Sequence, residues 1–295
     1  MPSSLPRPPV DLPIRRLTRD DLVPCADLSE DRGWPRDEHR WGLLLTAGTA
    51  YGIDDPEGKG LMASCVVTSY GPEDAAVGMM LVAGRHARKG IARYLMHAVI
   101  ESTGGAALSL HATDAGRPLY EQLGFEAVGR TDRMSGLFRP GAAPERDAGD
   151  GGAVRVRPAS AGDLPDILRL DTRATGLDRT QLLARLPAFA DHLRVAEENG
   201  ALVGYGALWP SAQSHALGPL VARDTATAKL LVASLAGATD RPLRADIDAR
   251  HTDLLAWLGA HGLEPGAPTT LMTLGGTRQP GDRERYFAPL SVATG

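Results

Sequence analysis

The sequence contains few cysteines and no long apolar run. Its two cysteines, Cys25 and Cys65, are too few for a disulfide framework and have no metal-ligand spacing, so we interpret both as small core residues. No apolar run approaches the roughly 18 residues that cross a bilayer. The proline-rich start, residues 1–13, has no apolar segment typical of a signal peptide. We therefore expect a cytoplasmic protein with no metal and no membrane partner.

An excess of basic residues is also absent. The chain has 32 Lys and Arg against 36 Asp and Glu, which gives a formal net charge of −4. This charge argues against a general nucleic-acid binder, and it is too small to indicate the charge of a small-molecule partner. With 295 residues, 43% of them apolar, the chain is long enough for two domains with cores of ordinary size.

The most informative stretch runs from Val77 to Glu101. Residues 77–82 form a short apolar run typical of a buried strand. A basic turn with two glycines follows at residues 84–90. Apolar residues then recur at helical spacing from Ile91 to Val99. The order of strand, basic turn and helix predicts an anion-binding site, because the first N–H groups of a helix have no partner within it.

Charged residues and a glycine strengthen this prediction. Arg88, Lys89 and Arg93 bring positive charge to the helix start, where the helix dipole is also positive. Gly90 has no side chain, so a ligand can approach the main chain closely. We predict a bound phosphate or pyrophosphate; the alternative is a surface turn whose basic side chains are only solvated.

These residues resemble the acetyl-CoA signature of the GNAT N-acetyltransferase superfamily, Gln/Arg-x-x-Gly-x-Gly/Ala. Gly90 and Ala92 occupy its fourth and sixth positions, and Ala87 stands where the family has Gln or Arg. A second segment, residues 112–125, resembles the family's helix that carries a tyrosine and ends in Leu-Gly-Phe. Both matches come in the family's order, and the resemblance covers residues 12–139.

The resemblance implies an N-acetyltransferase that moves an acetyl group from acetyl-CoA to a primary amine of a small molecule by direct attack. It implies that Tyr120 donates a proton to the departing thiolate; the alternative is a packing aromatic. The backbone N–H of Val82 is the simplest donor to the oxyanion. The residues expected to contact the cofactor are Leu81, Val82, Arg88, Lys89, Gly90, Ile91, Ala92, Arg93 and Arg117.

The sequence is also compatible with alternatives. The alternative function is a non-catalytic acyl-CoA-binding or sensor protein on the same scaffold, and a purely nucleotide-binding protein is disfavoured because no Walker spacing exists. Arg117 could contact CoA or simply be exposed. The acceptor is unidentified and a homodimer is possible. The candidate general bases are Glu30, Asp37, Glu38 and His111.

The first half is predicted to be a mixed, mostly antiparallel sheet flanked by helices. We expect Asp114 to cap the helix at residues 115–123, Gly124 to end it, and Leu119 and Leu123 to face the core with Tyr120 toward the cleft. The other elements are predicted as strands at 14–17, 49–53, 61–70, 77–82, 108–112 and 125–130, and helices at 18–29, 37–46 and from 91.

A second copy follows a polar linker at residues 141–153. The segment that begins at Val156 mirrors the one that begins at Ile14, with the capping residues Ser160 and Thr18 placed 142 positions apart. We therefore predict two GNAT-like domains in tandem in an α/β class with a mixed α+β sheet, an acetyl-CoA-binding domain at residues 1–140 and a degenerate one at residues 154–295.

The second copy lacks the residues that carry chemistry in the first. The segment that matches residues 88–92 is 226–231, which has no glycine and a single cation, Lys229. Leu258 stands at the position of Tyr120. We expect that this copy does not bind the cofactor as the first does, and that it helps to shape the acceptor site or a dimer.

Overall fold

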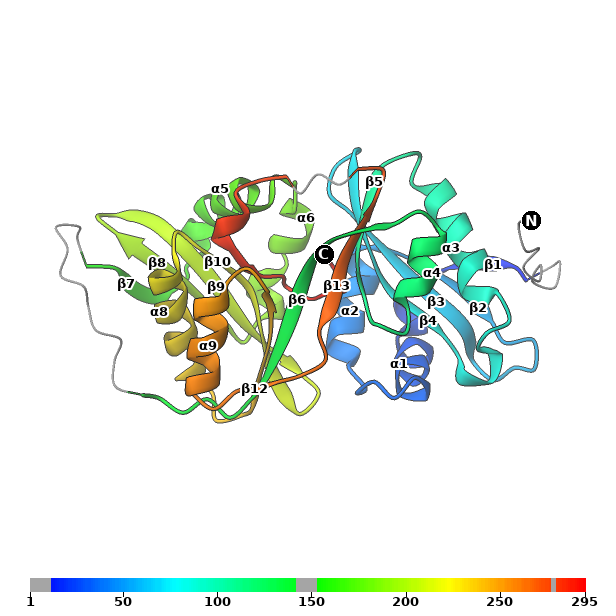
Figure 1. The fold of residues 1–295 in the computed structure, drawn as a ribbon, viewed down its shortest axis with the longest axis horizontal. Coiled ribbons are helices and arrows are strands. Elements are labelled where there is room, and N and C mark those ends of the chain that lie inside the picture. Colours follow the sequence, from blue (N-terminus) through cyan, green and yellow to red (C-terminus); the bar gives the residue numbers. More distant parts are fainter. Residues whose placement is uncertain (1–11, 142–152, 277–279) are drawn as a thin grey trace.

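The computed structural model describes residues 12–141, 153–276 and 280–295. Within these residues one mixed sheet of 14 strands runs through both halves and is flanked by helices (Figure 1). Most neighbouring strands are antiparallel, and the parallel pairs are β4 with β5 and β10 with β11. This confirms the predicted fold class.

The first half contains six strands, with helices on both faces of the sheet. Its strands are β1 (Ile14–Leu17), β2 (Thr49–Asp54), β3 (Leu61–Ser69), β4 (Asp74–Val82), β5 (Ala107–Ala112) and β6 (Glu126–Gly136). Helices α1 (Leu22–Asp31) and α2 (Glu38–Ala47) bury their apolar residues on one face. Helices α3 (Ile91–Ser102) and α4 (Arg117–Gln122) pack on the other.

The second half repeats this order with additions at its end. Its strands are β7 (Arg155–Pro158), β8 (His192–Glu198), β9 (Ala201–Ser211), β10 (Ser214–Ala222), β11 (Leu243–Asp248), β12 (Glu264–Pro265), β13 (Thr269–Leu274) and β14 (Tyr286–Ala288). Its helices are α5 (Leu164–Thr175), α6 (Thr180–Leu183), α7 (Leu186–Phe189), α8 (Thr225–Ala236) and α9 (Thr252–Ala260).

The predicted duplication extends to individual interactions. Both predicted capping boxes are present, each at a short 3-10 turn that leads into α1 or α5. In each copy the acidic residue of the box also binds an arginine on the first strand: Asp21 binds Arg15 at 2.7 Å, and Asp163 binds Arg157 at 2.8 Å. The two halves therefore start with the same local structure.

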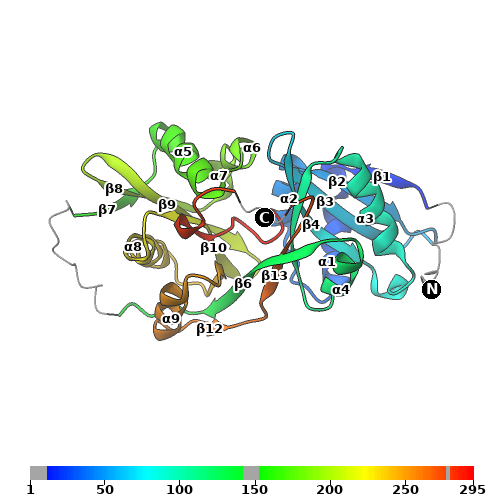
Figure 2. The same ribbon diagram turned by 45° about the horizontal axis from the view of Figure 1, so that its top comes forward.

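The halves exchange strands at the centre of the molecule. Strand β13, from the second half, lies between β5 and β6, and β6, from the first half, pairs with β11 (Figures 1 and 2). Each half therefore completes its sheet with the last long strand of the other. The division predicted from the sequence does not anticipate this exchange. Residues 142–152 of the predicted linker lie outside the described part of the chain.

The predicted start of α4 is wrong. The helix begins at Arg117 after Gly116, and Asp114 does not cap it. Gly116 is the N-cap residue and no side chain caps the helix; the Thr113 hydroxyl accepts a hydrogen bond from the Gly116 N–H at 3.3 Å in the turn that precedes it. The predicted stop is right: Gly124 follows the helix with a φ of +87°, a conformation that favours glycine.

Candidate active site

Strands β4 and β5 separate part-way along their length. They pair in parallel only between residues 74–77 and 107–110. Beyond this point β4 has a bulge, with Met79 at a φ of +49°, and it continues to Val82 without a β5 partner in the described chain. The edge of β4 that faces β5 is therefore open over its last residues.

Main-chain donors lie along this open edge. The Ala83 N–H donates to the carbonyl of Met62 on the β3 side at 2.8 Å. Because successive N–H groups of a strand point to opposite sides, the Val82 N–H points toward the diverging end of β5. Leu81 is buried and, by the same alternation, its main-chain groups point toward β3.

The predicted anion site follows directly after β4. Gly90 is the N-cap of α3 at a φ of +79°, and no side chain caps the helix. The first N–H groups of α3 are therefore open to an anion. Arg88 and Lys89 are exposed on the preceding loop, and neither side chain has a partner among the residues that the structure describes. Ile91 is buried and anchors the helix in the core.

A buried carboxylate that the sequence reading did not single out holds this loop. Asp55 lies in the β2–β3 connection, and it binds His86 at 2.8 Å and Arg85 at 2.6 Å. The hydrogen bonds from His86, the backbone N–H of Glu57 and Arg85 hold the pKa of Asp55 well below its usual range. Arg85 and His86 thus position the loop. The two basic residues that follow them, Arg88 and Lys89, have no side-chain partner in the described chain.

The other two basic residues that were predicted to contact the cofactor, Arg93 and Arg117, already have side-chain partners. Arg93 donates a hydrogen bond to Gln122 on α4. Arg117 is exposed and forms an ion pair with Glu121 at 2.7 Å, four residues along the same helix. An exposed pair of this kind is weak, so a phosphate could replace Glu121 as the partner. The role of Arg117 in binding CoA stays a prediction.

Tyr120 lies in the core cluster on the α3 side of the sheet, and Leu119 and Leu123 pack against the same cluster as predicted. Its predicted access to the cleft stays a prediction. Tyr120 is the buried residue of α4, whereas Leu119 and Leu123 are half-buried. It packs edge-on against Phe125, with ring centroids 5.8 Å apart. Burial raises its pKa, so the hydroxyl stays protonated at neutral pH. Among the described residues this hydroxyl has no hydrogen-bond partner.

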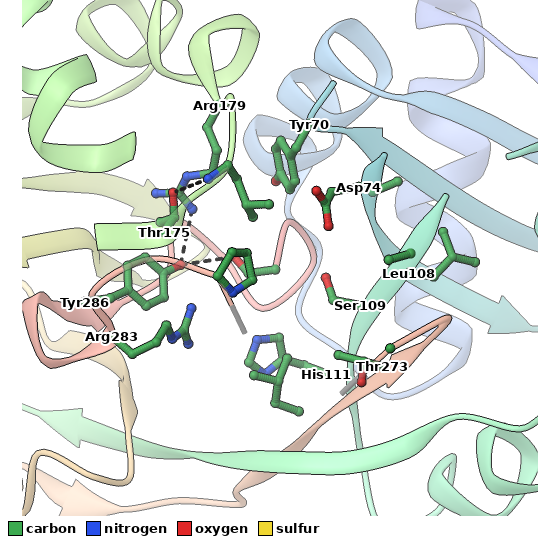
Figure 3. A pocket seen from close by; sticks show the side chains of 17 residues that line it. Tyr70, Asp74, Leu108, Ser109, His111, Thr175, Arg179, Thr273, Arg283 and Tyr286 are labelled. Carbon is green, nitrogen blue, oxygen red and sulfur yellow. Dashed lines mark hydrogen bonds between the residues drawn. The ribbon is translucent and has the colours of Figure 1, made fainter. Parts of the chain in front are cut away.

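A cavity lies on the other face of β4 and β5, away from α3 and between the two halves (Figure 3). On β5, Leu108 and Leu110 pack with the α3 cluster, and the alternating residues Ser109 and His111 line the cavity. His111 comes one residue after the last β4–β5 pair, so it lies where the strands diverge. Polar side chains from both halves also line the cavity: Tyr70, Asp74, Ser109, Arg283 and Tyr286.

His111 can act as a proton acceptor. Its Nδ1 lies 3.3 Å from the hydroxyls of Thr131 and Thr269, and no described residue binds its Nε2. Desolvation by burial lowers its pKa to about 4, so the imidazole is neutral at pH 7.

The other candidate bases are engaged elsewhere. Asp37 is buried, caps α2 and accepts a hydrogen bond from the Ser211 hydroxyl at 2.8 Å, which ties the two halves together. Glu30 and Glu38 bind Arg36 at the surface. Of the four candidates, His111 is the one that lines the cavity.

Comparison with known proteins identifies the family. Profiles described as "Acetyltransferase (GNAT) domain" match residues 64–138 and 167–288, one in each half. The chain belongs to the GNAT acetyltransferase family. It is a tandem GNAT protein, and it has no described helix that is long and apolar enough to cross a membrane. The described residues also contain no cluster of side chains that could hold a metal.

Relatives of this tandem GNAT protein cover most of its length. The uncharacterized N-acetyltransferase YitH of Bacillus subtilis (strain 168) is 29% identical over 243 residues, which are 81% of this chain and 83% of YitH. A solved Pyrococcus horikoshii structure covers 96% of both chains with a TM-score of 0.79 and 19% identity. A tandem GNAT protein from the clavulanic acid biosynthesis pathway covers 90% of this chain and 99% of its own, with a TM-score of 0.66 and 16% identity.

The second GNAT copy has a filled cleft. Strands β10 and β11 also separate after three paired residues, but β14 pairs with β10 beyond that point. Phe287 of β14 is fully buried and stacks on His251 at 3.8 Å. The start of α8 is also closed to anions, because the Asp224 carboxylate caps it by accepting from the Thr227 N–H. Leu258, in place of the tyrosine, is fully buried.

The segment after β14 crosses to the first GNAT copy. The main chain of Ala293 lies directly against Gly78 on β4, so close that a Cβ at Gly78 would be 2.2 Å from the Ala293 oxygen. Tyr70 donates a hydrogen bond to the Thr294 carbonyl. No motif marks this segment, because its contacts are mainly to backbone atoms of residues distant in the sequence. The second copy therefore supplies a wall of the cavity beside His111 (Figures 2 and 3).

Proposed function

We propose that this GNAT protein is an N-acetyltransferase that uses acetyl-CoA and acts on a primary amine of a small molecule. One difference between the copies supports this proposal most directly. The first copy combines an open β4 edge with an uncapped helix start at Gly90, whereas the second has β14 and the Asp224 cap in the corresponding places. We assign the working site to the first copy.

The residues present fit acetyl-CoA. The open edge of β4 at Val82, next to the buried Leu81, offers main-chain groups to the amides of the pantetheine arm. The helix start and the free cations of the preceding loop suit a pyrophosphate. The residues proposed to bind it there are Arg88, Lys89, Gly90, Ile91, Ala92 and Arg93, with Arg117 at the rim.

The chain's own groups can assist each stage of the transfer. Bound acetyl-CoA would supply a thioester whose carbonyl carbon is attacked by the amine nitrogen, so that a C–N bond forms and the C–S bond breaks. Neutral His111 accepts the proton that the amine must lose. The Val82 N–H stabilises the negative charge on the carbonyl oxygen. Tyr120 gives its proton to the departing sulfur, so that a thiol leaves.

Binding can be tested by calorimetric titration with acetyl-CoA and CoA. We expect one site per chain, and an affinity that falls at least tenfold when Arg88 and Lys89 are both replaced by Gln, since two charge contacts to a diphosphate are lost. The matched control is Lys229→Gln at the corresponding place in the second copy, which should leave the affinity unchanged. Equal loss in the control would place the site in the second copy.

Turnover can be tested by following thiol release with a panel of small primary amines. We expect release above the rate of hydrolysis for part of the panel, and a reduction of one to two orders of magnitude in kcat for Tyr120→Phe, which keeps the ring but removes the proton. A chain that binds CoA but releases no thiol above background with any amine of the panel would instead be a non-catalytic acyl-CoA-binding protein.

A further inference from the structure

We infer that the cavity selects a basic α-amino acid as the acceptor, with its carboxylate on Arg283 and its side-chain cation on Asp74. This inference deepens the proposed function and rests on it for the identity of the reaction. It is based on two charged side chains of the cavity wall, Arg283 and Asp74, whose hydrogen-bonding groups are largely unused.

One cavity arginine is already neutralised. Arg179 is fully buried, and its guanidinium binds both oxygens of Asp171 at 2.6 and 2.9 Å. Its third nitrogen donates to the Tyr286 hydroxyl at 3.2 Å. Arg179 therefore holds the wall together and has little capacity for a ligand.

Arg283 differs, because most of its donors are unused. Its only ion-pair partner in the described chain is Asp248, at 3.3 Å from one terminal nitrogen, and this carboxylate also binds Arg250 at 3.0 Å. The Nε atom of Arg283 is buried without a partner. The guanidinium lies over the Tyr286 ring at 4.5 Å, which fixes it at the cavity wall. A planar guanidinium held in this way is suited to a carboxylate.

Asp74 supplies the opposite charge at the other end of the cavity (Figure 3). Its carboxylate has no hydrogen bond or ion pair to any residue that the structure describes. Asp74 is paired with Ala107, and His111 lies four residues further along β5. At about 3.3 Å per residue the two positions are ~13 Å apart, and a hydrogen bond at each end leaves roughly 7 Å for the ligand.

The walls between these ends suit a chain of methylene groups. Leu177, Leu271 and Pro280 line the cavity, and each is half-buried or buried. A ligand that fits carries a carboxylate near Arg283, a neutral amine beside His111, and a cation about one extended side chain away. Lysine and ornithine have this pattern. Simple diamines lack the carboxylate, and norleucine lacks the second cation.

The test compares three probes by calorimetry on the full-length protein saturated with CoA. We expect L-lysine to bind at least tenfold more tightly than cadaverine and at least tenfold more tightly than L-norleucine. Asp74→Asn should abolish the preference over norleucine and keep the preference over cadaverine. Arg283→Gln should do the reverse. Glu73→Gln, which changes an exposed neighbour outside the cavity, is the matched control and should keep both preferences.

Two results overturn the inference: L-lysine that binds no better than cadaverine or norleucine, or preferences that survive both substitutions. If Arg283→Gln does not fold, as a melting curve would reveal, Asp74→Asn still decides the outcome through the norleucine comparison. Turnover is measured separately. Selective binding of lysine without acetylation contradicts the proposed function and supports the inference, while acetylation of many amines without selectivity does the opposite.

Discussion

The neutral state of His111 makes a quantitative prediction for stability against pH. Burial lowers the pKa of His111 from 6.5 to about 4 in the folded protein. The unfolded chain therefore binds the proton more readily, and stability falls as pH decreases through the window from 6.5 to 4. One pKa unit corresponds to ~1.4 kcal/mol, so the full loss from this residue is about 3 kcal/mol, of which about 2 kcal/mol should appear between pH 7 and pH 5.

The assay is urea unfolding of the parent and of His111→Gln at several pH values. The variant keeps a polar side chain but has no proton to bind, so its stability should change less than that of the parent between pH 7 and pH 5, by about 2 kcal/mol. His97, an exposed histidine on α3, replaced in the same way should retain the parent's pH dependence. If His111→Gln and the parent lose the same stability, burial does not lower the pKa of His111, and the reasoning from its buried position is refuted.

Two further predictions concern the close backbone contact at Gly78 and the buried ion pair between Asp171 and Arg179. Gly78→Ala should displace the segment at Ala293, because the new Cβ meets backbone atoms. Urea unfolding should then show a free energy of unfolding that is lower by about 1–3 kcal/mol. The control is Gly42→Ala in α2, where a Cβ meets nothing, and it should raise the free energy of unfolding by roughly 0.5–1 kcal/mol. Asp171→Asn leaves the charge of Arg179 buried without its partner and should cost about 3–5 kcal/mol by the same measurement, and a loss below 1 kcal/mol would contradict the buried pair.

Local sequence signals predicted much of the first half. The capping box at Thr18, the helix after Gly90 and the stop at Gly124 are each set by a few neighbouring residues, and all are present. The predicted start of α4 is wrong because residues 114–116 form a turn before the helix, so that the N-cap is Gly116 and not Asp114. Features that depend only on residues adjacent in the sequence, such as caps and helix stops, can thus be predicted from the sequence.

Only the part of the candidate site that is contiguous in the sequence could be predicted. The loop that carries Arg88 and Lys89 is contiguous, so it was found directly. The choice of His111 among four bases required the cavity, whose walls come from β4, β5, β13 and the segment after β14. The motif predicts Tyr120 in the site, and the structure adds that its ring is buried with the α3 cluster, while a contact of its hydroxyl with a ligand stays a prediction.

The strand exchange predicts that neither half folds alone, although each matches a domain family. Cutting the chain between residues 142 and 152 leaves the first fragment without β13, which covers the β5 edge, and without the segment that lies against Gly78. We expect each fragment to be insoluble or unfolded by circular dichroism when expressed separately, and the two to co-purify as one folded complex that binds CoA when expressed together. A first fragment that is a folded monomer and binds CoA with the parent's affinity would show that the degenerate copy is dispensable. The opposite result would explain physically why a copy with a filled cleft is needed: it completes the sheet and the cavity of the copy that binds the cofactor.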